Sequence, residues 1–513
     1  MQAAPSFPQR QSIRRLPVYN SAMSVRKTIR SSRPPHSPRI RLSTHANIVL
    51  RGRYLAKNDT GTIVETPAQL FWRVASDIAQ AERRYPPACR LPHAAQRWYD
   101  SMARLDLLPN SPTLMNAGRR LQQLSACFVL PVEDALASIY DSLKHQALIH
   151  QSGGGTGFSF SHVRPHHDLV ASSRGIVSGP ISFMRLFNLS TDVIKQGGTR
   201  RGANMGILRI DHPDIPYFIT LKQTPTEMTN FNLSVGTTDS FMQALLHHRT
   251  YALINPSTNT PTRRLPAQLI FDRLVEAAWA SGEPGLVFLD AINRANPTPR
   301  LGAIESTNPC GEQPLLAYES CTLGSINVAK FVTRSDTGPT IDFARLADTI
   351  SLAVRFLDNV IDRNRFPIPE IDRMTKQTRK IGLGIMDFAD LLIALNIPYN
   401  SDAALHTATT LMDFFRSHAH RASAGLATER GVFSAYRGSR LQTLHQRRRN
   451  ATVTTIAPTG SISLIADCSP GIEPIIRGAG SPPHHGRRRA HFGSSSLRPS
   501  RARPRSQSHL TPA

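Results

Sequence analysis

The sequence predicts an α/β protein that is preceded by a helical region. Between Leu124 and Pro474, short apolar runs alternate with helix-like segments, which is the pattern of an α/β domain. The clearest unit is a helix over Pro266–Trp279 that stops near Gly282 and leads into Gly285–Asp290, a strand that we expect to be buried. The apolar positions of this helix are Leu269, Phe271, Val275 and Ala278. At 513 residues, the chain is long enough for a large core and for more than one domain.

The N-terminal part divides into a tail and a helical region. Residues 1–47 are rich in Arg, Ser and Pro without apolar periodicity, so we expect a disordered basic tail. Its composition also allows an organellar transit peptide, and this alternative stays open. A helical region is predicted over residues 48–120, where Thr66 and Pro67 are typical of a helix N-cap and first turn. The apolar stripe that follows comprises Leu70, Phe71, Val74, Ile78 and Ala81.

Charge and cysteine content limit the function classes. The net charge is +25, but residues 1–50 and 477–513 together carry 17 basic side chains and no acidic one. The part between them is only mildly basic, which suits anionic small molecules as well as polynucleotides. No apolar stretch approaches the roughly 18 residues that a membrane span needs. Five cysteines without disulfide or zinc spacing predict free thiols in a reducing compartment.

The strongest chemical signal lies in Thr307–Leu315. Here the thiol of Cys310 is flanked within two residues by the amide of Asn308 and the carboxylate of Glu312. A possible hydrogen-bond donor and a possible base beside a lone thiol favour a chemical role over a structural one. An ordinary buried cysteine is the alternative. On spacing alone, Cys127 and Cys321 are predicted to be core residues of strands.

Three other segments are polar and rich in glycine. Gln151–Gly157 has a backbone that can approach a ligand closely, although such runs are often only flexible turns. Gln196–Asn204 adds two arginines, which favours phosphate or carboxylate recognition over a solvated loop. Ala457–Ser463 places hydroxyls and amides at a predicted strand-to-helix turn, a common anion site. This turn lacks the lysine of a P-loop, so a kinase is disfavoured.

Taken together, these segments resemble the catalytic subunit of ribonucleotide reductase, most closely the adenosylcobalamin-dependent class II ribonucleoside-diphosphate reductases. The matching phrases follow the family order over about residues 48–476. They are Pro109–Gly118, Ser125–Asp134, Gln151–Gly157, Gly197–Asn204, Asn308–Glu312 and Ala457–Ser461. The resemblance implies a ten-stranded α/β barrel, placed at residues 121–476 and incomplete at its C-terminus. A finger loop through its centre would carry Cys310.

The resemblance also implies the chemistry. Cys310 would carry the thiyl radical that takes the 3′-hydrogen of the ribose, Glu312 would be the base on the 3′-hydroxyl, and Asn308 would bind the sugar oxygens. Cys127 and Cys321 would supply two electrons and protons by becoming a disulfide, which replaces the core interpretation of this pair. The radical must come from a cofactor, which in class II enzymes is adenosylcobalamin.

Binding sites and partners follow from the same resemblance. The implied substrate site comprises Ser111, Ala126, Cys127, Gly155, Asn308, Pro309, Cys310, Gly311, Glu312, Pro458, Thr459, Gly460, Ser461 and Ile462. A dNTP effector site is expected at Asp134, Arg164 and the loops Ser172–Gly175 and Lys222–Thr229. The other implied partners are an external dithiol reductant such as thioredoxin and a second copy in a homodimer. The expected setting is DNA synthesis in the cytoplasm, with no protein-bound metal.

The resemblance stops at the last 37 residues. Residues 477–513 contain eight arginines, no acidic residue and no core pattern, so we expect a disordered tail on a truncated or frameshifted chain. Three hypotheses therefore stay open. The chain is a reductase, an inactive nucleotide-binding remnant of one, or a basic nucleic-acid binder. The last is the weakest, because the tail charges lack interleaved aromatic residues.

Overall fold

The computed structural model describes residues 40–86, 91–168, 178–194, 202–336 and 338–475. The predicted tails therefore lie outside the described residues, apart from residues 40–47. In that stretch the structure differs from the prediction, because helix α1 (Thr44–Val49) begins before Ile48. The hydroxyl of Ser43 accepts a hydrogen bond from the backbone N–H of Ala46 at 3.1 Å and caps this helix.

The predicted helical N-terminal region is confirmed. Helix α1 continues into the π-helical turn η1 (Leu50–Tyr54), and α2 (Pro67–Ala79) starts at the predicted cap. Thr66 and Gln69 form a reciprocal capping box there. Helix α2 packs against α3 (Leu91–Ala103), and the predicted apolar stripe of α2 is buried in their shared core. The short helix α4 (Ser111–Asn116) follows.

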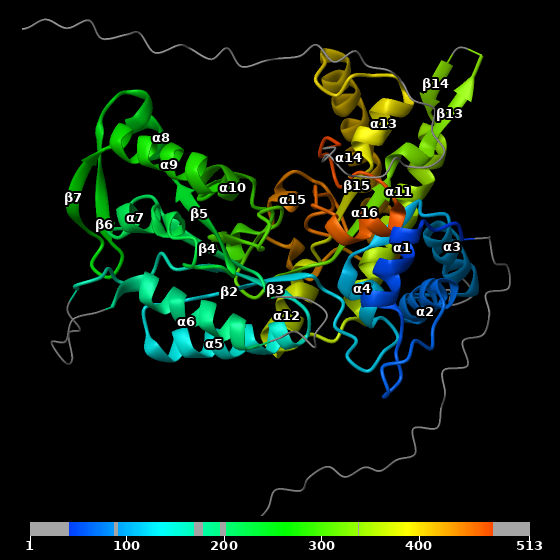
Figure 1. Ribbon diagram of the computed structural model, residues 1–513, viewed down its shortest axis with the longest axis horizontal. Coiled ribbons are helices and arrows are strands. Elements are labelled where there is room, and N and C mark those ends of the chain that lie inside the picture. Colours follow the sequence, from blue (N-terminus) through cyan, green and yellow to red (C-terminus); the bar gives the residue numbers. More distant parts are fainter. Residues whose placement is uncertain (1–39, 87–90, 169–177, 195–201, 337, 476–513) are drawn as a thin grey trace, which may run out of the picture. The chain divides into compact units, whose positions relative to one another are not determined.

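The first sheet contains six strands in the order β11-β2-β3-β4-β5-β8 (Figure 1). The strands are β2 (Cys127–Leu130), β3 (Gly155–Ser159), β4 (Asn204–Arg209), β5 (Phe231–Thr237), β8 (Gly285–Phe288) and β11 (Ser320–Cys321). All pairs are parallel except β11 with β2. Helices α5 (Leu136–Gln151) and α6 (Gly179–Val193) pack together and cover one face of the sheet (Figure 1).

A second, smaller sheet lies in the other half of the described chain. It has the order β1-β12-β15, formed by β1 (Leu107–Pro109), β12 (Leu323–Asn327) and β15 (Gly382–Met386). A single parallel bridge between Leu383 and Thr454 extends it by one more segment. The α-helices that follow β12 along the chain are α11 (Phe343–Arg363), α12 (Pro369–Thr378), α13 (Phe388–Ala394), α14 (Asp402–Arg430), α15 (Arg440–Thr443) and α16 (Gly460–Ala466). The core of this sheet is continuous with that of the N-terminal helices.

The finger loop connects the two halves. It is the hairpin β9 (Ser306–Thr307) and β10 (Pro314–Leu315), and β9 contacts β3 and β4 of the first sheet. The α/β class is confirmed. Within the described residues the strands form two open sheets and two-stranded hairpins, so the barrel, which was predicted to be incomplete at its C-terminus, is not closed by the described strands.

The predicted helix and strand on either side of Gly282 are both present, but the side chains that they bury differ from the expectation. Helix α9 spans Ala267–Ser281, and Gly282 ends it with a φ of +80°, a left-handed conformation that glycine adopts without strain. The buried face of α9 is Ala267, Ile270, Leu274 and Ala277, whereas the predicted Leu269 and Val275 are exposed. Strand β8 is not buried, because it forms the edge of its sheet and leaves Leu286 and Phe288 partly exposed.

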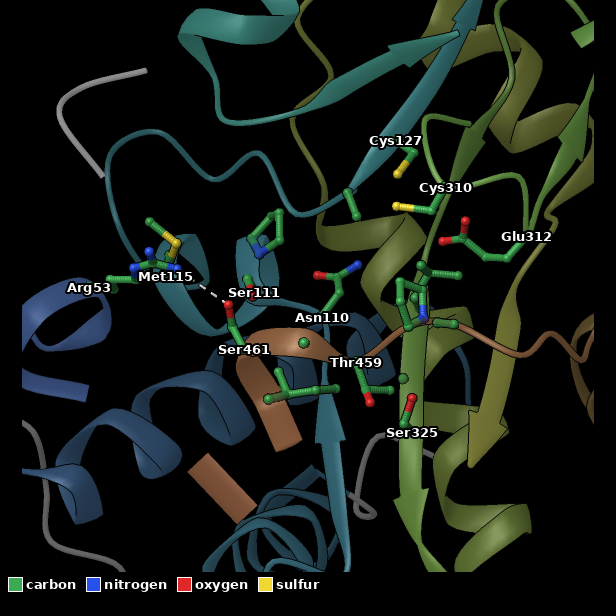
Figure 2. Close-up of a pocket in the computed structure, with 18 of the residues that line it drawn as sticks. Arg53, Asn110, Ser111, Met115, Cys127, Cys310, Glu312, Ser325, Thr459 and Ser461 are labelled. Carbon is green, nitrogen blue, oxygen red and sulfur yellow. Dashed lines mark hydrogen bonds between the residues drawn. The ribbon is translucent and has the colours of Figure 1, made fainter. Parts of the chain in front are cut away.

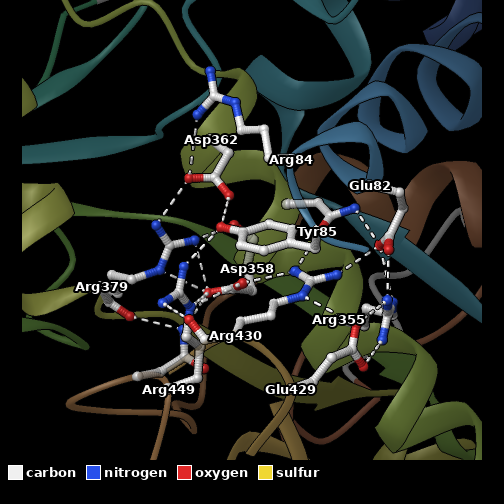
Figure 3. Close-up of polar contacts among 12 residues, drawn as sticks. Glu82, Arg84, Tyr85, Arg355, Asp358, Asp362, Arg379, Glu429, Arg430 and Arg449 are labelled. Carbon is white, nitrogen blue, oxygen red and sulfur yellow. Dashed lines mark hydrogen bonds and ion pairs between the residues drawn. The ribbon is translucent and has the colours of Figure 1, made fainter. Parts of the chain in front are cut away.

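A buried ion cluster joins the N-terminal helices to α11, α12 and α14 (Figure 3). Asp358, which is fully buried, accepts hydrogen bonds from Arg379 and Arg430 at 2.9 Å. Arg430 also donates to Glu82 at 2.8 Å, in the turn after α2. Ring stacking adds to these bonds, because the guanidinium of Arg430 lies 4.2 Å from the centre of the Tyr85 ring. The cluster therefore holds segments together that are far apart in sequence.

Among the described residues, no helix combines the length and apolarity that crossing a membrane requires.

Candidate active site

The tip of the finger is a tight turn built around Asn308. This residue is fully buried, and its side-chain oxygen accepts a hydrogen bond from the backbone N–H of Gln313 at 2.9 Å. Its side-chain N–H group donates to the carboxylate of Glu312 and to the sulfur of Cys127, the latter at 3.4 Å. Gly311 has a φ of +80°, so the turn uses a conformation that favours glycine. Asn308 thus fixes Glu312 and presents Cys310 at an exposed position.

Both sheets hold the finger in place. Asn232 of β5 donates a hydrogen bond to the carbonyl oxygen of Pro309 at 2.7 Å. From the other side, the hydroxyl of Thr455 donates to the carbonyl oxygen of Glu312 at 2.8 Å. The reactive turn is therefore positioned by groups from both halves of the fold.

The base of the finger is tied to the first sheet by His162. Its ring nitrogens lie 2.9 Å from a carboxylate oxygen of Glu305 and 2.8 Å from one of Glu133. The hydrogen bond with Glu305, joined by that with Glu133, outweighs burial and raises the pKa of His162 to about 9. At neutral pH the ring is therefore charged and holds both carboxylates.

The glycine run Gln151–Gly157 packs against the finger. A Cβ atom on Gly157 would lie 1.8 Å from the carbonyl oxygen of Thr307, and one on Gly155 would lie 2.8 Å from the ring of Pro309. The prediction of close backbone approach is correct, but the approaching group is the finger. Gly155, assigned above to the substrate site, contacts Pro309 and does not line the pocket described below.

Cys127 and Cys321 face each other across β2 and β11. They are register partners in this antiparallel pair, and both are buried. Directly opposite residues of such a pair have Cα atoms about 4.5–5.5 Å apart, within the range that a disulfide spans. Burial, together with a hydrogen bond to Cys127, raises the pKa of Cys321. The Cys321 thiol thus stays protonated at neutral pH and is able to give up hydrogen.

One pocket of about 300 Å³ brings most of the predicted site together (Figure 2). The predicted residues that line it are Ser111, Ala126, Cys127, Cys310, Glu312, Pro458, Thr459, Gly460, Ser461 and Ile462. The thiols of Cys127 and Cys310 point toward one another at one end (Figure 2). Asn308, Pro309 and Gly311 support the turn without lining the pocket, and Cys321 lies beside Cys127.

Sequence reasoning missed several residues of this pocket. They are Arg53, Tyr54, Asn110, Pro112, Met115, Leu323, Gly324, Ser325 and Ala457. Asn110, Pro112 and Met115 fall inside the matching phrase Pro109–Gly118, which was a signal that could have found them. Arg53 and Tyr54 carried no signal, because their segment showed neither a motif nor a periodic pattern. Their place depends on tertiary contacts, since the hydroxyls of Tyr54 and Ser111 share a hydrogen bond of 2.7 Å.

The predicted turn at Ala457–Ser463 is confirmed as the start of α16. Thr459 precedes the helix with a φ of +51°, and its hydroxyl oxygen accepts a hydrogen bond from the backbone N–H of Gly471 at 2.8 Å. Ser461 and Ile462 follow in the first turn and line the pocket, and Ser461 lies at the end away from Cys310 (Figure 2). The pocket therefore has a thiol end and a hydroxyl end.

The predicted effector residues do not share one pocket. Arg164 donates a hydrogen bond to Asp134 at 2.7 Å, whereas Lys222 and Thr229 line a separate cavity of about 630 Å³. The loop Ser172–Gly175 and most of Gly197–Asn204 lie outside the described residues. Asn204 itself is fully buried and accepts a hydrogen bond from Thr156 at 2.7 Å.

The chain is similar to known proteins of one family. The family profile for the ribonucleotide reductase barrel domain matches residues 125–481, and the profile for the all-alpha domain of the same family matches residues 41–122. A vitamin B12-dependent ribonucleoside-diphosphate reductase of Thermoplasma acidophilum is 48% identical over 492 residues, covering 85% of this chain and 64% of the relative. One of Mycobacterium tuberculosis is 49% identical over 442 residues, covering 85% and 62%. The chain therefore spans less than two thirds of the length of these relatives.

Proposed function

The chain belongs to the ribonucleotide reductase family, and we propose from this premise that it carries the site at which a ribonucleoside diphosphate is reduced to a 2′-deoxyribonucleotide. One observation carries the proposal. Cys310, Glu312 and Cys127 line a single pocket, with Cys321 paired to Cys127 across two strands. The diphosphate form of the substrate follows from the relatives, which are named ribonucleoside-diphosphate reductases.

Each side chain has one task in this reaction. The Cys310 sulfur removes a hydrogen atom from ribose C3′, while the Glu312 carboxylate takes the proton of the 3′-hydroxyl. The 2′-hydroxyl leaves as water after a thiol of the Cys127 and Cys321 pair donates a proton. The pair then supplies the hydrogen that replaces it at C2′ and ends as a disulfide, so two thiols provide two electrons and two protons. Cys310, which acts throughout as a thiyl radical, finally returns its hydrogen atom to C3′, and Glu312 returns its proton to the 3′-oxygen.

The geometry supports these tasks. The Asn308 side chain contacts both Glu312 and Cys127, so the base and the reductant are held by one amide. The raised pKa of Cys321 keeps its hydrogen on sulfur until it is needed.

The cofactor proposed is adenosylcobalamin, as the names of the relatives indicate. A pocket of about 300 Å³ suits a nucleotide, so a corrin ring would bind outside it, on the side where Cys310 is exposed. When bound, this cofactor supplies the first radical by breaking its carbon–cobalt bond.

The remaining partners belong to the same proposal. They are a dNTP effector near Asp134 and Arg164, an external dithiol such as thioredoxin, and a second copy in a homodimer. We place the protein in the cytoplasm, because Cys127, Cys321 and Cys468 are free thiols, which suits a reducing compartment.

The test is reduction of labelled CDP by this chain with adenosylcobalamin and a dithiol. We expect labelled dCDP from the wild type and none from Cys310→Ser, whereas CDP binding measured by calorimetry should be equal in the two proteins. Turnover by Cys310→Ser would remove Cys310 from its role. CDP binding without reduction by the wild type would instead indicate a nucleotide-binding protein that lacks activity.

A further inference from the structure

The pocket carries opposite charges at its two ends. Among the described residues that line it, Glu312 is the only acid and Arg53 the only base. They lie at opposite ends, with Glu312 beside the thiols and Arg53 beside Ser461 (Figure 2). A ligand that has a neutral sugar at the thiol end would therefore place its anionic part near Arg53.

Arg53 is available for such a ligand. Its guanidinium makes one long hydrogen bond, to the hydroxyl of Ser461 at 3.4 Å, and no ion pair within the described part of the chain. Arg73 and Arg119, by contrast, both bind the carboxylate of Glu65. Most of the five donors of Arg53 thus face solvent or the pocket.

The segment that carries Arg53 is fixed to the pocket. Tyr54 is buried, and its hydroxyl shares the hydrogen bond with Ser111, another lining residue. Helix α1 packs against α16, so the two ends of the described chain meet here. The position of Arg53 at the pocket rim is therefore defined by the fold, although its side chain is exposed.

We infer that Arg53 binds the terminal phosphate of the nucleotide, so that the N-terminal helical region reads the phosphate length of the substrate. This inference rests on the proposed function and deepens it. The planar guanidinium matches two phosphate oxygens at once, a geometry that a lysine cannot reproduce. A nucleoside without phosphates would gain nothing from Arg53.

Calorimetry on the whole chain tests this, with CDP, CMP and cytidine as ligands. We expect Arg53→Gln to weaken CDP binding about tenfold and to leave cytidine binding within about twofold, while Arg53→Lys recovers part of the loss. The matched control is Arg51→Gln, an exposed arginine of the same turn that does not line the pocket. It should bind all three ligands as the wild type does.

Two results would overturn the inference and leave the proposed function standing. One is unchanged CDP affinity in Arg53→Gln. The other is an equal loss for CDP and cytidine, which would mean that Arg53 only shapes the pocket. If the wild type itself binds no cytidine nucleotide, the proposed function fails, and this inference fails with it.

Discussion

At the scale of the residue, the side-chain amide of Asn308 organises the site. It is fully buried, and it contacts the carboxylate of Glu312, the sulfur of Cys127 and the backbone of Gln313. A buried amide with this many partners is costly to replace, because each partner would lose a hydrogen bond in a site with little access to water. One side chain therefore sets the relative positions of the Glu312 carboxylate and the Cys127 sulfur.

The cysteines should differ sharply in reactivity. Cys310 is exposed, whereas Cys127 and Cys321 are buried, and burial with nearby Asp387 raises the pKa of Cys468. Because alkylation requires an accessible thiolate, we expect iodoacetamide at neutral pH to modify Cys310 at least about tenfold faster than Cys127, Cys321 and Cys468. Mass spectrometry of peptides after a short exposure measures this.

Urea provides the control for this experiment, since all the cysteines should react alike once the chain unfolds. Rapid modification of Cys321 in the native protein would contradict the buried pair. Oxidation by diamide is a complementary experiment, and it should form a disulfide between Cys127 and Cys321 in the native chain.

Sequence reasoning worked at this scale where the signal was local. Asn308, Cys310 and Glu312 lie within five residues, so their gathering at one turn was predictable from their spacing. Cys127 and Cys321 looked like core residues on spacing alone, because only the pairing of β2 with β11 brings them together. Arg53 was missed for the same reason, as its contact with Ser461 spans 408 positions of sequence.

At the scale of the element, the glycines of β3 and the finger hairpin depend on each other. Strand β3 passes so close to β9 that no side chain fits at Gly157. The run of glycines predicted close approach correctly, but composition does not say whether a ligand or another strand approaches. The error in α9 has a similar origin. Apolar residues occur on more than one face of this helix, and only packing selects Ile270, Leu274 and Ala277 for burial.

Gly157→Ala should therefore destabilise the finger. The new Cβ atom would lie 1.8 Å from the carbonyl oxygen of Thr307, so β3 or the finger must move. We expect a loss of about 1–3 kcal/mol in the free energy of unfolding, measured by urea denaturation, together with loss of CDP reduction.

Gly425→Ala is the matched control for this substitution. Gly425 lies within α14, and a Cβ atom there would meet nothing within 4 Å. Alanine should stabilise the helix by up to about 1 kcal/mol and leave CDP reduction unchanged. Equal stability of the Gly157→Ala and Gly425→Ala proteins would show that β3 and the finger do not constrain each other.

At the scale of the whole molecule, the ion cluster of Figure 3 is the main polar link between distant segments. Burial alone would disfavour the charge on Asp358, but Arg379, Arg449 and Arg430 outweigh it and lower its pKa below the ordinary 3.8. The pKa of Glu82 is lowered in the same way, because Arg355 and Arg430 outweigh the effect of burial. No sequence pattern predicted this cluster, since its members come from four separate elements.

Asp358→Asn should consequently change both the stability of the protein and its dependence on pH. At pH 7 the variant leaves buried arginines without their carboxylate, and we expect a loss of about 3–5 kcal/mol in the free energy of unfolding. Because the pKa of Asp358 is lowered in the folded state, the wild type gains this stability fully above the ordinary pKa and loses it as pH falls below about 4. The difference in the free energy of unfolding between the two proteins should therefore shrink in urea titrations from pH 7 to pH 3.

The control is Asp413→Asn, which removes an exposed ion pair with Arg416. This substitution should lower the free energy of unfolding by less than about 1 kcal/mol at any of these pH values. A deficit in Asp358→Asn that stays constant with pH would mean that packing, and not charge, accounts for the role of Asp358.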